Sequence, residues 1–101
     1  MRLTIPISLI FTLFLFSATS AWSADWKQGR YAYDRGDFTT ALREWRPLAE
    51  QGHSVAQNNL GFLYQFGEGV PQDYKTAVKW HTLAAEQGHA LAQRVLGSMY
   101  D

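Results

Sequence analysis

Residues 50–53 read Glu50-Gln51-Gly52-His53, and 36 positions later the chain repeats the same four residues as Glu86-Gln87-Gly88-His89. Outward from these tetrapeptides, residues 37–65 share 13 identities with residues 73–101 over 29 positions. The other identical pairs are Asp37/Asp73, Thr40/Thr76, Ala41/Ala77, Ala49/Ala85, Ala56/Ala92, Gln57/Gln93, Leu60/Leu96, Gly61/Gly97 and Tyr64/Tyr100. A fixed period of this length is the signature of a repeat architecture.

Each period is expected to form two helices. Between Phe38 and Gln51 the apolar residues recur at the three- and four-residue spacing of one helical face. Asp37 precedes this helix and can accept hydrogen bonds from its first N–H groups, while Gly52 can end it in the left-handed conformation. Asp73 and Gly88 bracket the next helix in the same way. The sequence therefore predicts an all-α fold with helices near 25–35, 38–51, 54–66, 74–87 and 90–101.

Small residues indicate how these helices pack. Gly61 and Gly97 would let the two helices of a repeat approach closely. Helix pairs of this kind cannot bury their apolar faces alone and stack into a superhelix. The expected architecture is a short right-handed α-solenoid of about two and a half repeats. Four aromatic residues fall at core spacing and are expected to be structural: Trp45, Tyr64, Tyr74 and Tyr100.

The N-terminus has a different composition. Met1 and Arg2 precede a mostly apolar run from residue 3 to residue 16, and small residues follow. This order is typical of a secretory signal peptide, with cleavage after Ala21 or Ser23, so residues 1–23 are assigned to it. The alternative is a membrane anchor, but a spanning helix needs about 20 apolar residues. The mature chain would then be periplasmic or secreted, with no membrane association after cleavage.

Composition excludes several classes of protein. Nine Lys and Arg residues balance nine Asp and Glu residues, whereas a nucleic-acid-binding protein concentrates basic residues on one face. The chain has no cysteine, which excludes disulfides, thiolate nucleophiles and Cys-ligated zinc. No cofactor or metal motif is present in the sequence, and no cofactor is expected.

The residues between positions 56 and 88 resemble the Sel-one-like repeat, a long-loop relative of the tetratricopeptide repeat. The matching residues are Ala56, Leu60, Gly61, Tyr64, Gly67, Gly69, Val70, Asp73, Ala77, Trp80, Ala84, Ala85 and Gly88. The resemblance implies a tetratricopeptide-like unit over 24–53, a Sel-one-like repeat over 54–89 and the first helix of a third repeat over 90–101. The chain departs from the family pattern at Gln28, where leucine is usual, and at His81, which takes the core position of Trp45.

The same resemblance implies a function. In this family the first helix of each pair lines a concave surface on which proteins or peptides bind. Carried over residue by residue, the concave face would present Trp26, Arg30, Tyr33, Asn58, Phe62, Gln65, Arg94 and Ser98. Aromatic and arginine anchors suit a recognition groove. The alternative is that these are ordinary exposed side chains.

No constellation of catalytic residues stands out, and the chain is not expected to be an enzyme. His53 and His89 are equivalent positions one repeat apart, expected at helix starts on the surface and too far apart to share a metal ion. His81 is expected to be partly buried and hydrogen-bonded, with pH sensing as the alternative.

The leading hypothesis is an exported protein-interaction scaffold. One alternative is a secreted hydrolase acting on cell-wall-type substrates, although the relatives concerned depend on cysteines. Another is a fragment of a longer solenoid, because the chain ends inside a repeat. The last helix carries the apolar residues Leu91, Val95, Leu96 and Met99, and of these Val95 and Met99 have no obvious cover. This helix is therefore expected to dock against a second copy of the chain or against another protein.

Overall fold

The computed structural model describes residues 23–100, which form five helices and no strand. The helices are α2 (Trp26–Asp34), α3 (Phe38–Glu50), α4 (Ser54–Phe66), α5 (Tyr74–Glu86) and α6 (Ala90–Met99). Each expected helix is present, with bounds that differ by at most two residues, and the all-α class is confirmed. The segment assigned to a signal peptide lies outside the described residues except for Ser23. In residues 23–100 no helix combines the length and the apolar character that crossing a membrane requires.

The helix ends follow the capping rules. The Asp37 carboxylate accepts a hydrogen bond from the Thr40 N–H at 3.2 Å, and the Asp73 carboxylate accepts one from the Thr76 N–H at 3.1 Å. Gly52 follows α3 with a φ of +96°, a conformation that residues with a Cβ rarely adopt. Both expected caps and the closing glycine are therefore confirmed.

His53 and His89 also cap helices. The Nδ1 atom of His53 accepts a hydrogen bond from the Ala56 N–H at 3.1 Å, and that of His89 accepts one from the Ala92 N–H at 3.2 Å. An accepting Nδ1 requires the imidazole proton to lie on Nε2. These equivalent histidines therefore begin α4 and α6, and one structural role accounts for both.

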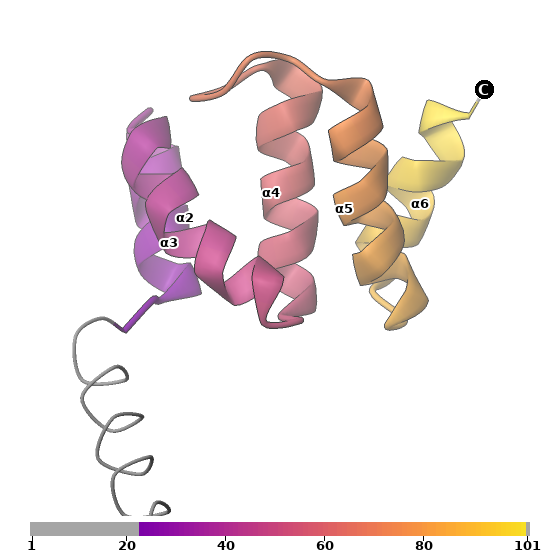
Figure 1. Cartoon of the computed structure of the whole chain (residues 1–101), viewed down its shortest axis with the longest axis horizontal. Coiled ribbons are helices and arrows are strands. Elements are labelled where there is room, and N and C mark those ends of the chain that lie inside the picture. The colour runs from indigo at the N-terminus through magenta and orange to yellow at the C-terminus, as the bar shows by residue number, and fades with distance from the viewer. Residues whose placement is uncertain (1–22, 101) are drawn as a thin grey trace, which may run out of the picture.

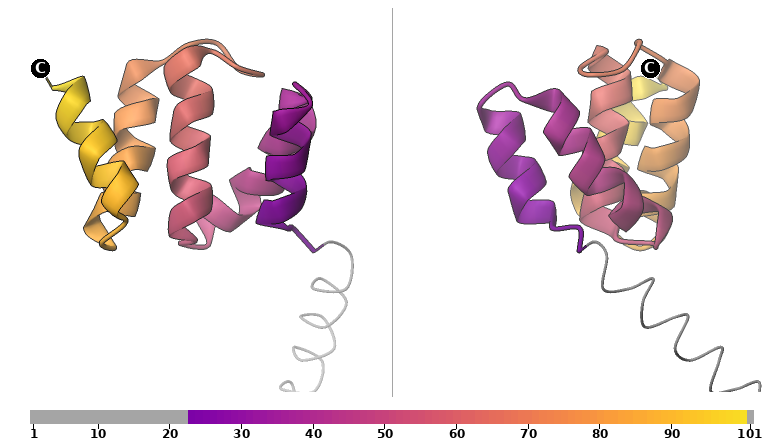
Figure 2. Two further views of the ribbon diagram at one scale, coloured as in Figure 1. Left: turned by 180° about the vertical axis from the view of Figure 1, so that it is seen from behind. Right: turned by 60° about the vertical axis from the view of Figure 1, so that its left-hand side comes forward.

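The helices alternate in direction and form two layers (Figure 1). The face toward the viewer in Figure 1 carries α3 and α5, and the view from behind in Figure 2 shows α2 and α6 on the opposite face. Neighbours in sequence pack against each other, from α2 on α3 through to α5 on α6. The core cluster is made of small residues and three large ones: Ala32, Ala41, Trp45, Ala49, Ala56, Leu60 and Leu63.

Two glycines mark equivalent helix junctions. A Cβ at Gly61 would lie 2.7 Å from Cε1 of His81, and a Cβ at Gly29 would fall within the Trp45 ring. The expected close approach at Gly61 is confirmed. The corresponding expectation for Gly97 is wrong, because a Cβ there would have no neighbour within 4 Å. No helix of the described residues packs against that side of α6.

Two of the aromatic residues expected in the core are exposed. Tyr74 is 59% exposed and Tyr100 is 72% exposed. Tyr74 is the first residue of α5, so no preceding helical turn covers it. Tyr100 caps the end of α6, and no following turn covers it within the described residues. Trp45 is buried as expected, and Tyr64 is half-buried with its hydroxyl accepting a hydrogen bond from Arg46 at 3.0 Å.

Candidate functional site

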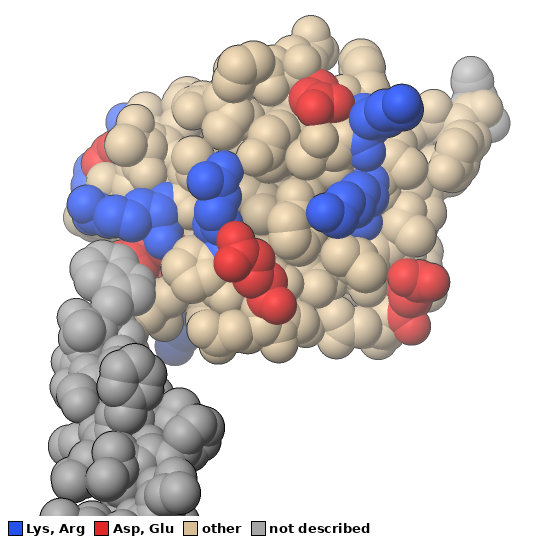
Figure 3. Space-filling view, in the orientation of Figure 1, with Lys and Arg blue, Asp and Glu red and all other residues tan. Residues whose placement is uncertain are grey.

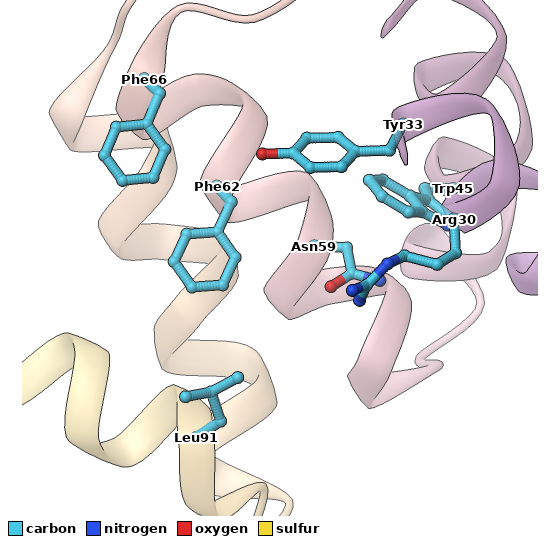
Figure 4. A pocket seen from close by; sticks show the side chains of 7 residues that line it. All are labelled: Arg30, Tyr33, Trp45, Asn59, Phe62, Phe66 and Leu91. Atoms are coloured by element: carbon cyan, nitrogen blue, oxygen red, sulfur yellow. The ribbon is translucent and has the colours of Figure 1, made fainter. Parts of the chain in front are cut away.

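A hollow of about 270 Å³ opens on the side of the molecule formed by α2, α4 and α6 (Figure 4). Its lining comes from four helices, so all three repeat units contribute to one surface. Drug-sized ligand sites usually occupy roughly 300–1,000 Å³. This hollow is smaller and open, a size that suits one or two side chains of a larger partner. We call it the concave groove, lined by Arg30, Tyr33, Trp45, Asn59, Phe62, Phe66 and Leu91.

One wall of the concave groove is fixed by Tyr33. Its ring lies 5.8 Å from the Trp45 ring and 5.2 Å from the Phe38 ring. Its hydroxyl donates a hydrogen bond to the Glu68 carboxylate at 2.9 Å, which ties α2 to the loop between α4 and α5. Burial and the neighbouring Glu68 charge raise the pKa of Tyr33 above its usual value of 10.0. The phenol therefore stays neutral and points in one direction.

The opposite wall is an aromatic pair on α4. Phe62 and Phe66 lie one turn apart with parallel rings whose centroids are 6.0 Å apart. Phe62 also meets the buried His81 ring edge-on at 5.0 Å, so its position depends on the α4–α5 junction. Phe66 is 57% exposed, although it is aromatic and apolar. An exposed aromatic ring beside a hollow is a usual anchor point in protein recognition.

Arg30 supplies the positive charge at the rim. Its Nε atom lies 3.2 Å from the Asp34 carboxylate one turn further along α2. Both side chains are about 60% exposed, and an exposed pair of this kind contributes roughly 0–1 kcal/mol. Figure 4 shows the Arg30 side chain extending toward Asn59. Little free energy holds the guanidinium on Asp34, so it can turn to a partner's carboxylate or carbonyl oxygen.

His81 lies beneath this wall, fully buried between α4 and α5. Its Nδ1 is 2.7 Å from Oδ1 of Asn58, and its Nε2 is 3.0 Å from Oε1 of Gln65. Burial lowers the pKa of His81 to about 4, so the ring is neutral at pH 7. A neutral imidazole has one N–H, so one of the two amides must turn its NH₂ group to the other ring nitrogen. The expected hydrogen bonding of His81 is confirmed, and its burial is complete rather than partial.

The eight residues carried over to the concave face do not form one site. Arg30, Tyr33 and Phe62 line the concave groove. Gln65 and Ser98 line a separate hollow with Tyr74, Val78 and Met99. Trp26 and Arg94 line neither of these hollows, although both are exposed.

Asn58 does not lie on the concave face as expected. It is only 1% exposed and its amide is engaged by His81, so it cannot reach a partner in this structure. The next residue, Asn59, lines the concave groove instead. Register along α4 explains the shift, since successive helical residues are about 100° apart and only one of two adjacent asparagines can face the groove.

Sequence reasoning missed four residues of the lining. Trp45 was assigned to the core, and it is buried, yet part of its ring forms the floor. Phe66 lies one helical turn after Phe62, a spacing that could have identified it. Asn59 and Leu91 carry no signal of their own, because polar and apolar residues at helix surfaces are common.

The described residues hold few clusters of titratable side chains. Within the part of the chain that the structure describes, no three His, Asp or Glu residues lie close enough together to hold a metal ion. The concave groove contains one cation and one phenol, whose proton is engaged by Glu68. The other polar group of the lining is the amide of Asn59. Aromatic rings, an arginine and an amide are side chains that can bind a polypeptide.

One known protein family matches part of the chain. Residues 54–89, which contain α4 and α5, match the family model of the Sel1 repeat. No curated protein is significantly similar to the chain. Sel1 repeats generally mediate protein–protein interactions and are typically not enzymatic. The chain is therefore a helical protein whose residues 54–89 are similar to the Sel1 repeat.

Proposed function

We propose that this chain is an exported scaffold that binds a protein or peptide in the concave groove. The observation that carries the proposal is the arrangement of Tyr33, Phe62 and Phe66 around an open hollow rimmed by Arg30. Aromatic and arginine side chains are the residue types that most often dominate binding energy at protein interfaces.

Two rings of the groove are held in place before a partner binds. Tyr33 is held by Glu68 and Trp45, and Phe62 is held by His81 and Phe66. Side chains fixed before binding lose little conformational entropy when a partner arrives, which favours affinity. The expected ligand is a segment that inserts an apolar side chain between the rings and presents an acceptor to Arg30.

A matched pair of variants tests the groove. Purified chain is used as bait for envelope proteins of the organism that exports it, and any captured protein is titrated against Arg30→Glu/Phe66→Asp. The Arg30→Glu/Phe66→Asp variant is expected to lose its binding to that protein. The control Lys27→Glu/Tyr31→Asp likewise replaces one cation and one aromatic ring by carboxylates, at exposed positions of α2 outside the groove lining. Equal binding to both variants would contradict a binding site in the concave groove.

Export has its own test. The N-terminal order of charged, apolar and small residues supports cleavage after Ala21 or Ser23. N-terminal sequencing of the protein from the exported fraction is expected to begin at residue 22 or residue 24. Intact Met1 in the membrane fraction would favour an anchor instead.

A further inference from the structure

The face opposite the concave groove carries a row of basic residues, Arg43 and Arg46 on α3 and Lys75 and Lys79 on α5. All four are exposed. Figure 3 shows basic side chains in a row across the middle of this face, with acidic ones mainly above and below it. Arg43 and Lys79 are 36 positions apart and hold the same place in successive repeats, so the repeat itself places them in line. We call these four residues the convex basic row.

An apolar floor lies beside the arginines. A hollow of about 470 Å³ runs along α3, and all of its lining comes from that one helix. Leu42 and Pro47 are half-buried and form its apolar part, with Arg43 and Arg46 beside them. The lining residues are Thr39, Leu42, Arg43, Arg46, Pro47 and Glu50, which follow the spacing of one helical face.

The contacts of two cations leave their charge in place. Arg46 donates to the hydroxyl of Tyr64 at 3.0 Å, and the Lys79 ammonium lies 5.3 Å from the centre of the Trp80 ring. Neither partner is a carboxylate.

Glu50 and Glu86, both exposed, are the last residues of α3 and α5. The helices begin with acidic caps as well: the exposed Asp73 lies near Lys75, and Asp37 lies near Arg43. The acidic side chains thus lie at the ends of the helices, and the basic ones lie across the middle of the face (Figure 3).

We propose that the convex basic row is a second interaction face for an acidic, amphipathic protein segment. Carboxylates of such a segment would meet Arg43, Arg46 and Lys79, and its apolar side chains would lie on Leu42 and Pro47. Opposite charge across an interface sets the partner and speeds association.

A protein segment fits better than a membrane or a nucleic acid. The described residues include eight basic and eight acidic side chains, so the domain as a whole has no net attraction to a polyanion. Binding at an anionic bilayer usually adds apolar side chains that insert among the headgroups. Here the apolar residues beside the arginines, Leu42 and Pro47, are half-buried, so neither offers a fully exposed side chain for insertion.

The test uses a fluorescent helical peptide with Leu at every third or fourth position and Glu at most others. Anisotropy titration of the purified chain is expected to show saturable binding that weakens as salt is added. Arg43→Glu/Lys79→Glu is expected to lower affinity roughly tenfold or more. Lys27→Glu/Arg94→Glu, with the same change of charge on α2 and α6, is expected to retain it. Circular dichroism verifies that both variants remain helical.

Three further arms separate the explanations. A peptide with Ser in place of Leu is expected to bind weakly, and equal binding would overturn the role of the apolar floor. Arg30→Glu/Phe66→Asp is expected to leave peptide binding unchanged, so the two faces succeed or fail separately. Binding to phosphatidylglycerol vesicles without binding to the peptide would overturn the proposal in favour of a lipid surface. Equal loss in both charge-reversal variants would overturn it in favour of unspecific attraction.

Discussion

The junction between α4 and α5 makes a sharp prediction, which is that Gly61→Ala destabilises the protein. The new methyl group would lie 2.7–2.9 Å from three atoms of the His81 ring, closer than carbon atoms normally pack. The ring cannot move away easily, because it is fully buried and hydrogen-bonded to Asn58 and Gln65. The two helices must separate or the hydrogen bonds must break.

The magnitude follows from opposing terms. Overpacking of a core usually costs about 1–3 kcal/mol, and a strained or broken buried hydrogen bond adds about 1 kcal/mol. Alanine is favoured over glycine inside a helix by about 1 kcal/mol, which offsets part of this. We expect a net loss of about 1–3 kcal/mol. In a domain of this size each kcal/mol lowers Tm by about 4–8 °C.

Gly97→Ala is the matched control for this measurement. Gly97 is the repeat equivalent of Gly61, yet a methyl group there would meet no atom within 4 Å. The higher helix propensity of alanine should then keep or slightly raise the free energy of unfolding. Thermal and urea unfolding followed by far-ultraviolet circular dichroism would compare the two. The reasoning is refuted if Gly61→Ala is as stable as Gly97→Ala. A double-mutant cycle with His81→Ala would show whether the ring is the source of the cost.

Three other measurements address the junction and the last helix. The folded-state pKa of His81, about 4, is below its ordinary 6.5, so unfolded chains bind more protons between these values. Unfolding free energy should therefore fall by up to roughly 3 kcal/mol from pH 7 to pH 4, and His81→Gln should flatten that part of a pH series of urea titrations. Asn58→Ala should cost about 1–3 kcal/mol in the same assay, because a ring nitrogen of His81 loses its partner, and unchanged stability would argue against that hydrogen bond. Analytical ultracentrifugation should show self-association that Val95→Glu/Met99→Glu abolishes, and a parent chain that stays monomeric at high concentration would end that hypothesis.

The fold was predictable because its signals are local and repeated. Asp37 and Gly52 specify the ends of α3 by hydrogen bonding and by a positive φ, and both effects act within a few residues. The candidate site was only partly predictable, because exposure depends on which side of a helix faces its neighbour. Asn58 and Asn59 are adjacent and chemically identical, and only the packing of α5 decides which of them is buried.

The two helix junctions show how one substitution in a repeat changes what the surface presents. Trp45 covers Gly29, and its indole N–H reaches the backbone oxygen of Trp26 at 2.9 Å. Gly61 is the counterpart of Gly29, 32 positions later, and His81 covers it. By the same offset Asn58 is the counterpart of Trp26.

An imidazole is shorter than an indole and pairs here with the Asn58 side chain rather than with the backbone. Gln65, the counterpart of Tyr33, is likewise turned toward His81, whereas Tyr33 remains in the groove wall. The exchange of Trp for His thus draws two amide side chains of α4 into the α4–α5 junction. What remains for a partner on α4 is the aromatic pair Phe62 and Phe66 together with Asn59. Two amides of α4 thus pair with the core histidine, and the two phenylalanines give the groove wall its apolar character.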